Sequence, residues 1–167
     1  MKLLLTNCCL AFLCMSCINN RHPHREYMII DKDSLEIKVP VATQIEKLKE
    51  KGFQVFSYVD DATKDTVIMQ QYFMAFLKKG PNRNQSEEEA TKLQEAHQAH
   101  LGRMYELGYA DISGPFGDDG DLRGITVYNV PTLKIADSLA NLDPMMKAGR
   151  LKVEIKPWWA GKGYPLR

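Results

Sequence analysis

The order of strand-like and helix-like segments is the feature that most restricts the fold of this chain. From residue 66 onward, segments that alternate apolar and polar residues are interrupted twice by segments with helical spacing of apolar residues. The predicted strands are 66–79, 109–117, 122–130 and 150–157, and the predicted helices are 86–108 and 131–143. This order predicts the ferredoxin-like split βαβ fold, an α+β arrangement with two helices on one face of an antiparallel sheet.

The ends of these elements carry local signals. Ser86 and Glu89 have the spacing of a capping box, which predicts the start of the first helix. Pro131 suits the start of the second helix, which we expect to stop at Asp143 because proline follows. The last strand is expected to stop at Pro157, since proline cannot donate a backbone hydrogen bond.

A shorter region precedes this fold. Apolar residues at Val41, Ile45 and Leu48 predict an amphipathic helix that ends at Gly52, and a strand follows it. The chain then divides into a signal peptide with a lipobox at 1–17, a flexible tether at 18–40, an N-terminal helix-plus-strand extension at 41–65, the main domain at 66–160 and a C-terminal tail at 161–167.

The N-terminus has the composition of a targeting segment. One lysine and a short apolar run are typical of a secretory signal peptide, and all four cysteines lie within residues 8–17. The end of the run, "LCMSC", resembles the lipobox of bacterial lipoproteins, with Ser16 before Cys17. We therefore expect lipidation at Cys17 and a protein anchored in a bacterial cell envelope, at the periplasmic side of the outer membrane or the cell surface. Lipidation at Cys9 or Cys14, and a cytosolic chain with an apolar N-terminus, are the alternatives.

Charge and cysteine content exclude several function classes. The net charge is +1, with 22 basic and 21 acidic residues, so no surplus of positive charge indicates nucleic acid binding. A chain processed at Cys17 has no other thiol, which excludes a cysteine nucleophile and a zinc-thiolate site. We expect no metal, because the His22/His24 pair has no further Cys or His in the predicted tether, and the His97/His100 pair shows only two ligands with no carboxylate that repeats its spacing.

Two histidines fall in the apolar stripe of the first long helix. At about 100° per residue, His97 lies near the centre of an apolar arc of about 120° and His100 lies nearer one flank. A histidine on such a face is more often a hydrogen-bonded core residue than a catalyst. The periodicity alone leaves both roles open.

Four segments together resemble the YCII family of small dimeric ferredoxin-like α/β-barrel proteins. They are "YFMAFLKKG", "HLGRMYELGYADISGPF", "GITVYN" and "NLDPMMKAGRLKVEIKPWW". The resemblance implies a homodimer formed by two sheets, and it implies that His100 and Asp143 are the active-site histidine and aspartate. His97 has no counterpart in the family pattern, so we expect it in the core or beside a bound ligand. An aspartate before proline also commonly caps a turn, which is the alternative for Asp143.

Other candidates have weaker support. Gly114, Phe116 and Trp158 could line a ligand pocket, although the two aromatic residues could equally belong to a dimer interface or a sheet edge. The acidic run 118–121 lacks the ligand spacing of a calcium loop and predicts a solvated hairpin turn. Arg103 could bind an anion, but a surface ion pair is commoner.

Two functions from different classes fit these residues. One is a cofactor-independent isomerase, lyase or dehydrohalogenase that uses His100 as general acid/base and Asp143 to orient it, on an unknown small molecule. The other is a non-catalytic dimeric ligand-binding or scaffold lipoprotein. A cleft that brings His100 and Asp143 within hydrogen-bonding distance favours the enzyme, whereas a filled core there favours the scaffold.

Overall fold

The computed structural model describes residues 39–166. Its elements are α1 (Val41–Glu50), β1 (Val55–Val59), β2 (Thr66–Lys79), α2 (Glu87–Glu106), β3 (Ala110–Pro115), β4 (Leu122–Tyr128), α3 (Leu133–Asn141), α4 (Pro144–Lys147) and β5 (Leu151–Gly161). The predicted signal peptide, Cys17 and almost all of the predicted tether lie outside the described residues. Within them, no helix is both long enough and apolar enough to cross a membrane.

All strands of the sheet pair antiparallel around β2. One edge of β2 pairs with β1 through its first residues and with β4 through its last residues, while β5 pairs along residues 69–79 of the opposite edge. β3 pairs with the outer edge of β4. The four strands of the main domain therefore have the order β5-β2-β4-β3, which confirms the predicted ferredoxin-like α+β fold.

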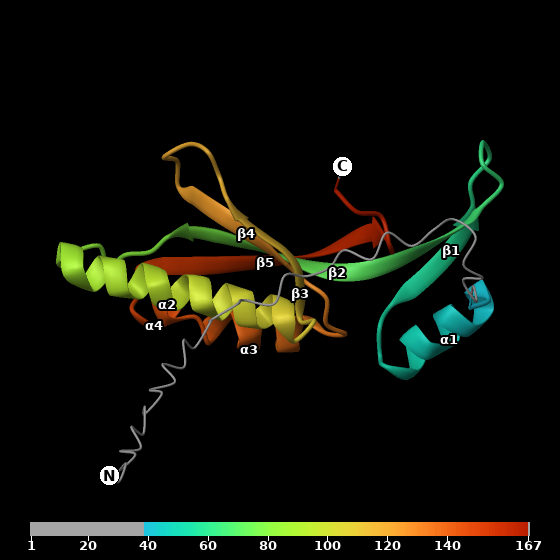
Figure 1. The fold of residues 1–167 in the computed structure, drawn as a ribbon, viewed down its shortest axis with the longest axis horizontal. Helices are drawn as coiled ribbons and strands as arrows, with labels where there is room; N and C mark the ends of the chain where they lie inside the picture. Colours follow the sequence, from blue (N-terminus) through green and yellow to red (C-terminus); the bar gives the residue numbers. More distant parts are fainter. Residues whose placement is uncertain (1–38, 167) are drawn as a thin grey trace, which may run out of the picture. The chain divides into compact units, whose positions relative to one another are not determined.

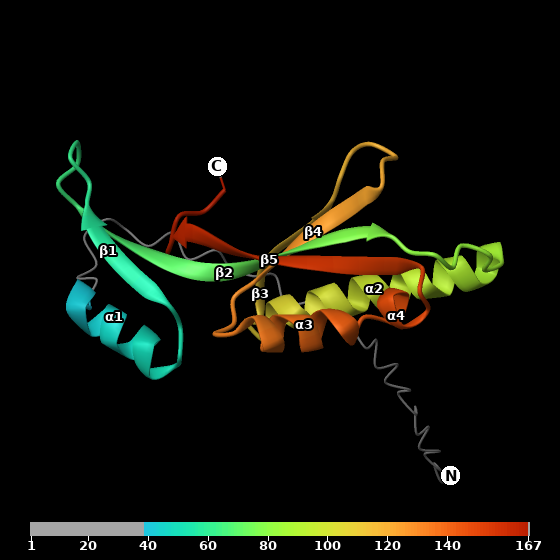
Figure 2. The same cartoon turned by 180° about the vertical axis from the view of Figure 1, so that it is seen from behind.

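Helices α2, α3 and α4 cover one face of this sheet (Figures 1 and 2). Alternate positions of β2 face them, and Phe73 and Ala75 join the core together with Tyr128 of β4. Met104 of α2 and Ala136 of α3 close the core from the helix side. The alternation in the sequence thus places every second residue of β2 against the layer of helices.

The intervening positions of β2 face the other side of the sheet. Tyr72 lies opposite Trp158 of β5, with ring centroids 6.3 Å apart, and Met74 and Phe76 follow along the strand. We call this side the open face, because no helix of the described part of the chain covers it (Figure 1). At one end, residues 161–166 turn back toward Tyr72 and help to enclose a cavity of about 470 Å³.

The extension continues the sheet. β1 pairs with the first part of β2, and Phe56 packs on Trp159 of β5 with ring centroids 5.1 Å apart. α1 contacts both β1 and β2. Gly52, with φ of +82°, lies in the turn from the helix to the strand, as the sequence predicts.

Several element boundaries differ from the sequence prediction, among them the end of the second long helix, which is Asn141 rather than the expected Asp143. The second long helix begins at Leu133, because the hydroxyl of Thr132 rather than Pro131 forms its start by accepting a hydrogen bond from the Ile135 amide. β5 continues through Pro157 to Gly161. Since β5 pairs only with β2 among the described strands, it is an edge strand, where a proline can lie with its nitrogen away from the neighbouring strand.

Candidate functional site

α2 holds His97 between the helical layer and the sheet. The predicted capping box starts this helix: the Ser86 hydroxyl accepts a hydrogen bond from the Glu89 amide, and the Glu89 carboxylate accepts one from the Ser86 amide. Eleven residues after Ser86, His97 lies on the face of α2 that contacts α4 and is only 8% exposed. His97 thus belongs with Met104 to the buried face of α2.

Asp143 lies at the start of α4, a short helix that the sequence analysis did not predict. Its Oδ1 atom accepts a hydrogen bond from the Met145 amide at 2.8 Å, and Pro144 occupies the first helical position. The side chain is 3% exposed. The capping role considered for Asp143 is thus present, but it uses only one of the two carboxylate oxygens.

The second oxygen of Asp143 binds His97. The distance between Asp143 Oδ2 and His97 Nδ1 is 2.6 Å, and both side chains are buried. The expected pairing of Asp143 with His100 is wrong: the structure brings Asp143 to the histidine one helical turn earlier. A carboxylate that accepts a hydrogen bond from Nδ1 fixes the orientation of the ring and leaves Nε2 as the free nitrogen.

His100 lies beside this pair without a hydrogen bond to it. Its Nε2 atom is buried and has no hydrogen-bond partner among the described residues. Burial lowers the pKa of His100, and the nearby charges of Lys147 and Arg103 act in the same direction, while Asp143 opposes them. His100 is therefore held in an environment that disfavours its charged form.

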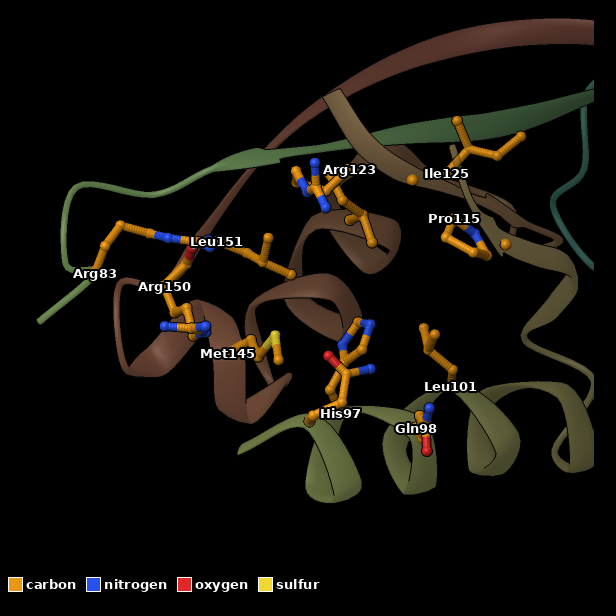
Figure 3. Close-up of a pocket in the computed structure, with 14 residues that line it drawn as sticks. Arg83, His97, Gln98, Leu101, Pro115, Arg123, Ile125, Met145, Arg150 and Leu151 are labelled. Carbon is orange, nitrogen blue, oxygen red and sulfur yellow. The ribbon is translucent and has the colours of Figure 1, made fainter. Parts of the chain in front are cut away.

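A cavity of about 320 Å³ opens against His97 (Figure 3). The His97 ring points from α2 into this space, and Gln98 and Leu101 lie on the same side (Figure 3). Leu77 and Ile125 line it from the sheet. A buried His-Asp pair that reaches a cavity of this size can exchange a proton with a small molecule.

Three arginines also line the cavity: Arg83, Arg123 and Arg150. They come from the loop before α2, from β4 and from the turn before β5. The sequence analysis missed them because they lie far apart in the chain and no motif links them. Their only sequence signal is that each lies within three residues of a predicted strand or helix boundary.

The remaining candidates are divided between two sides of the sheet. Gly114 lines the His97 cavity. Trp158 lines the second cavity, on the open face, and so lies apart from His97. Phe116 is 42% exposed and lines neither cavity. The acidic turn contributes Asp119, which pairs with Arg123 at 2.7 Å.

Within residues 39–166, no group of three or more His, Cys, Asp or Glu side chains is arranged to hold a metal ion. The polar side chains that line the cavity and could hold a small molecule include His97 and the three arginines.

Comparison with known proteins places the chain in a family. No curated protein matches the sequence. A solved structure with a similar chain is the 5-chloro-2-hydroxyhydroquinone dehydrochlorinase of Burkholderia phenoliruptrix in complex with 2,5-dihydroxybenzoquinone. It is 22% identical, the match covers 52% of this chain and 92% of that one, and the TM-score is 0.40. The YCII-related domain model matches residues 72–159, more than half of the chain. The chain therefore belongs to the YCII-related domain family.

Proposed function

We propose that this protein is a small-molecule enzyme of the isomerase or lyase type in which His97 is the general acid/base. The observation that carries the proposal is the 2.6 Å contact between Asp143 and His97 beside a cavity. The role that the family resemblance implies for His100 passes to His97, because His97 is the histidine that both binds Asp143 and reaches the cavity. Asp143 acts as its positioning residue.

The chemistry follows from the geometry of the ring. With Nδ1 donating to Asp143, the neutral imidazole has its lone pair on Nε2, which can remove a proton from a molecule in the cavity. The carboxylate also stabilises the imidazolium that forms, as in other His-Asp pairs. Such a base can return the proton to a different atom or allow a leaving group to depart, so it needs no nucleophile.

The test uses His97→Gln, Asp143→Asn and His100→Gln. Wild-type protein is screened against small enolisable and halogenated compounds, and general acid/base catalysis contributes about 10²- to 10⁴-fold to a rate. We expect any activity found to fall by at least about 100-fold in His97→Gln and to survive in His100→Gln. Acylation of the wild-type protein with diethylpyrocarbonate, followed by peptide mass mapping, gives a second readout. A His97 that resists acylation, or an activity that survives His97→Gln, would reject the proposal.

We also propose that two copies of the chain pair through their open faces. The support is the apolar character of Met74, Phe76 and Trp158, which point away from the helical layer. Light scattering at micromolar concentration should give the mass of a dimer for wild type and of a monomer for Met74→Glu. Thr91→Glu, on the exposed side of α2, is the control. A monomeric wild type would contradict the pairing.

The anchoring of the chain is a further proposal, which the sequence alone supports. We infer that Cys17 is lipidated and holds the domain at the cell envelope. Metabolic labelling with a fatty acid should mark the wild type and not Cys17→Ala, and only the wild type should stay with the membrane fraction. Equal labelling of both would reject Cys17 as the modified residue.

A further inference from the structure

Arg83, Arg123 and Arg150 face the same cavity as His97 although they belong to three different parts of the chain. Figure 3 shows Arg83 and Arg150 toward one end of the cavity and Leu101 and Pro115 toward the other, with His97 between them. The lining residues include no aspartate or glutamate. The cavity thus carries positive charge at one end and apolar side chains at the other.

Two of these arginines have no acidic partner within residues 39–166. Arg150 donates a hydrogen bond to the Gln85 side-chain oxygen at 2.8 Å, and Arg83 donates to the Arg150 carbonyl oxygen at 3.2 Å. Within the described part of the chain, no carboxylate lies within 4.0 Å of either guanidinium. Both neighbours are neutral acceptors, so they position the guanidinium groups without compensating their charge.

Arg123, the third arginine, differs from the other two because it has an acidic partner. Arg123 pairs with Asp119 at 2.7 Å, but the Asp119 side chain is 91% exposed. An exposed ion pair is worth little, so Asp119 can be exchanged for another anion at small cost. Arg83 and Arg150 therefore provide the uncompensated charge and Arg123 can add to it.

We propose that the His97 cavity binds a small organic anion, with its carboxylate or equivalent acidic group held by Arg83 and Arg150. Guanidinium groups bind planar carboxylates through paired hydrogen bonds, which fixes the direction of the ligand as well as its charge. The rest of the molecule then lies between His97 and the apolar end of the cavity formed by Leu101 and Ile125. A volume of about 320 Å³ suits a molecule of about the size of a substituted six-membered ring.

This inference deepens the proposed function, because it names the substrate class of the same site. It also explains how a reacting atom would reach His97: an acidic group held at one end directs the carbon skeleton past the imidazole. Positioning of this kind contributes to rate through orientation. Binding of the anion, however, needs no reaction at His97, so the two proposals can be tested apart.

The experiment measures binding by isothermal titration of the purified full-length chain. The probes are benzoate and maleate, and neutral benzamide matches benzoate in shape. We expect benzoate to bind at least about tenfold more tightly than benzamide, and the Arg83→Gln/Arg150→Gln double variant to lose at least this factor for benzoate. Arg103→Gln, an exposed arginine of α2 outside the cavity, should bind benzoate like wild type. Circular dichroism and melting temperature confirm that each variant folds.

The outcomes separate the two proposals. Equal binding of benzoate and benzamide, equal loss in Arg103→Gln, or no binding of either anion at 10 mM would overturn the anion site. Benzoate binding that depends on Arg83 and Arg150, together with a His97 that resists acylation, would retain the anion site and reject the catalytic proposal. Benzoate binding that His97→Gln retains and the double arginine variant loses supports the assignment of the charge-binding role to the arginines.

Discussion

Asp143→Asn should reverse the tautomer of His97. The carboxylate uses one oxygen to cap α4, through the Met145 amide, and the other to accept from His97 Nδ1. Asparagine has a single acceptor oxygen, so if that oxygen keeps the cap, its amide group points toward His97 and donates to Nδ1. A neutral ring must then carry its proton on Nε2, which removes the lone pair that faces the cavity.

The cost in stability can be worked from the same contacts. A hydrogen bond to a charged group contributes about 1.5–3 kcal/mol and a neutral one about 0.5–1.5 kcal/mol. Asp143→Asn should therefore lower the free energy of unfolding by about 1–2 kcal/mol. Asp143→Ala loses the cap as well and leaves His97 Nδ1 buried without a partner. We expect it to cost about 3–5 kcal/mol, as for a broken buried pair. The difference between the two variants reports on the cap together with the neutral hydrogen bond to His97.

The assay is a long-range ¹H–¹⁵N spectrum of the histidine side chains above pH 7, which distinguishes protonated from unprotonated ring nitrogens. His97→Gln assigns the signals, and urea unfolding of each variant gives its free energy. An Asp143→Asn variant whose His97 keeps its proton on Nδ1 would refute the reasoning. So would an Asp143→Ala variant as stable as wild type.

Three further substitutions test other parts of the structure. Ser86→Ala removes the capping box that starts α2 and should cost about 1 kcal/mol, measured by thermal unfolding against the exposed substitution Thr91→Ala, which leaves the cap in place. Gly80→Ala brings a Cβ within 2.2 Å of the Gly149 carbonyl oxygen, so the backbone must shift; we expect a loss of about 1–3 kcal/mol in urea unfolding, and an unchanged midpoint would contradict the close approach. His100→Gln should flatten the fall in stability on the acidic side: because burial lowers the pKa of His100 in the folded state, the unfolded chain takes up a proton first as pH falls below about 6.5, and the wild type loses stability there. Melting curves from pH 7.5 to 5 check this, and equal slopes for the two proteins would count against it.

The periodic segments made the fold predictable from the sequence. In β2 the alternation matches burial most clearly at Phe73, Ala75 and Leu77, which are buried on the helix side while the intervening residues are half-buried, and the helical spacing after Ser86 matches the inward face of α2. The capping box predicted the start of α2 because its two hydrogen bonds lie within four residues. Signals of this kind are local, so a single sequence contains them.

The site needed information that is not local. His97 and His100 share one apolar face, and the sequence cannot say which of them meets Asp143, because that depends on where α4 lies against α2. α4 itself has only four helical residues, too few for a periodic pattern. The convergence of Arg83 and Arg150 likewise depends on the pairing of β2 with β5, which brings the end of β2 beside the start of β5.

The eight residues 143–150 connect the proposed base with the cationic end of the cavity. Asp143 begins α4 and orients His97, Met145 lines the cavity two residues later, and Gly149 ends the turn with φ of +67°. Arg150 follows at once, with its amide donating to the Met145 carbonyl and its own carbonyl accepting from Gly80. The base and the cationic end of the cavity are thus positioned by one turn, which is tied to the end of β2. A change in the length of this turn would move Asp143, the partner of His97, together with Arg150. The catalytic proposal and the anion-binding proposal therefore depend on the same short segment.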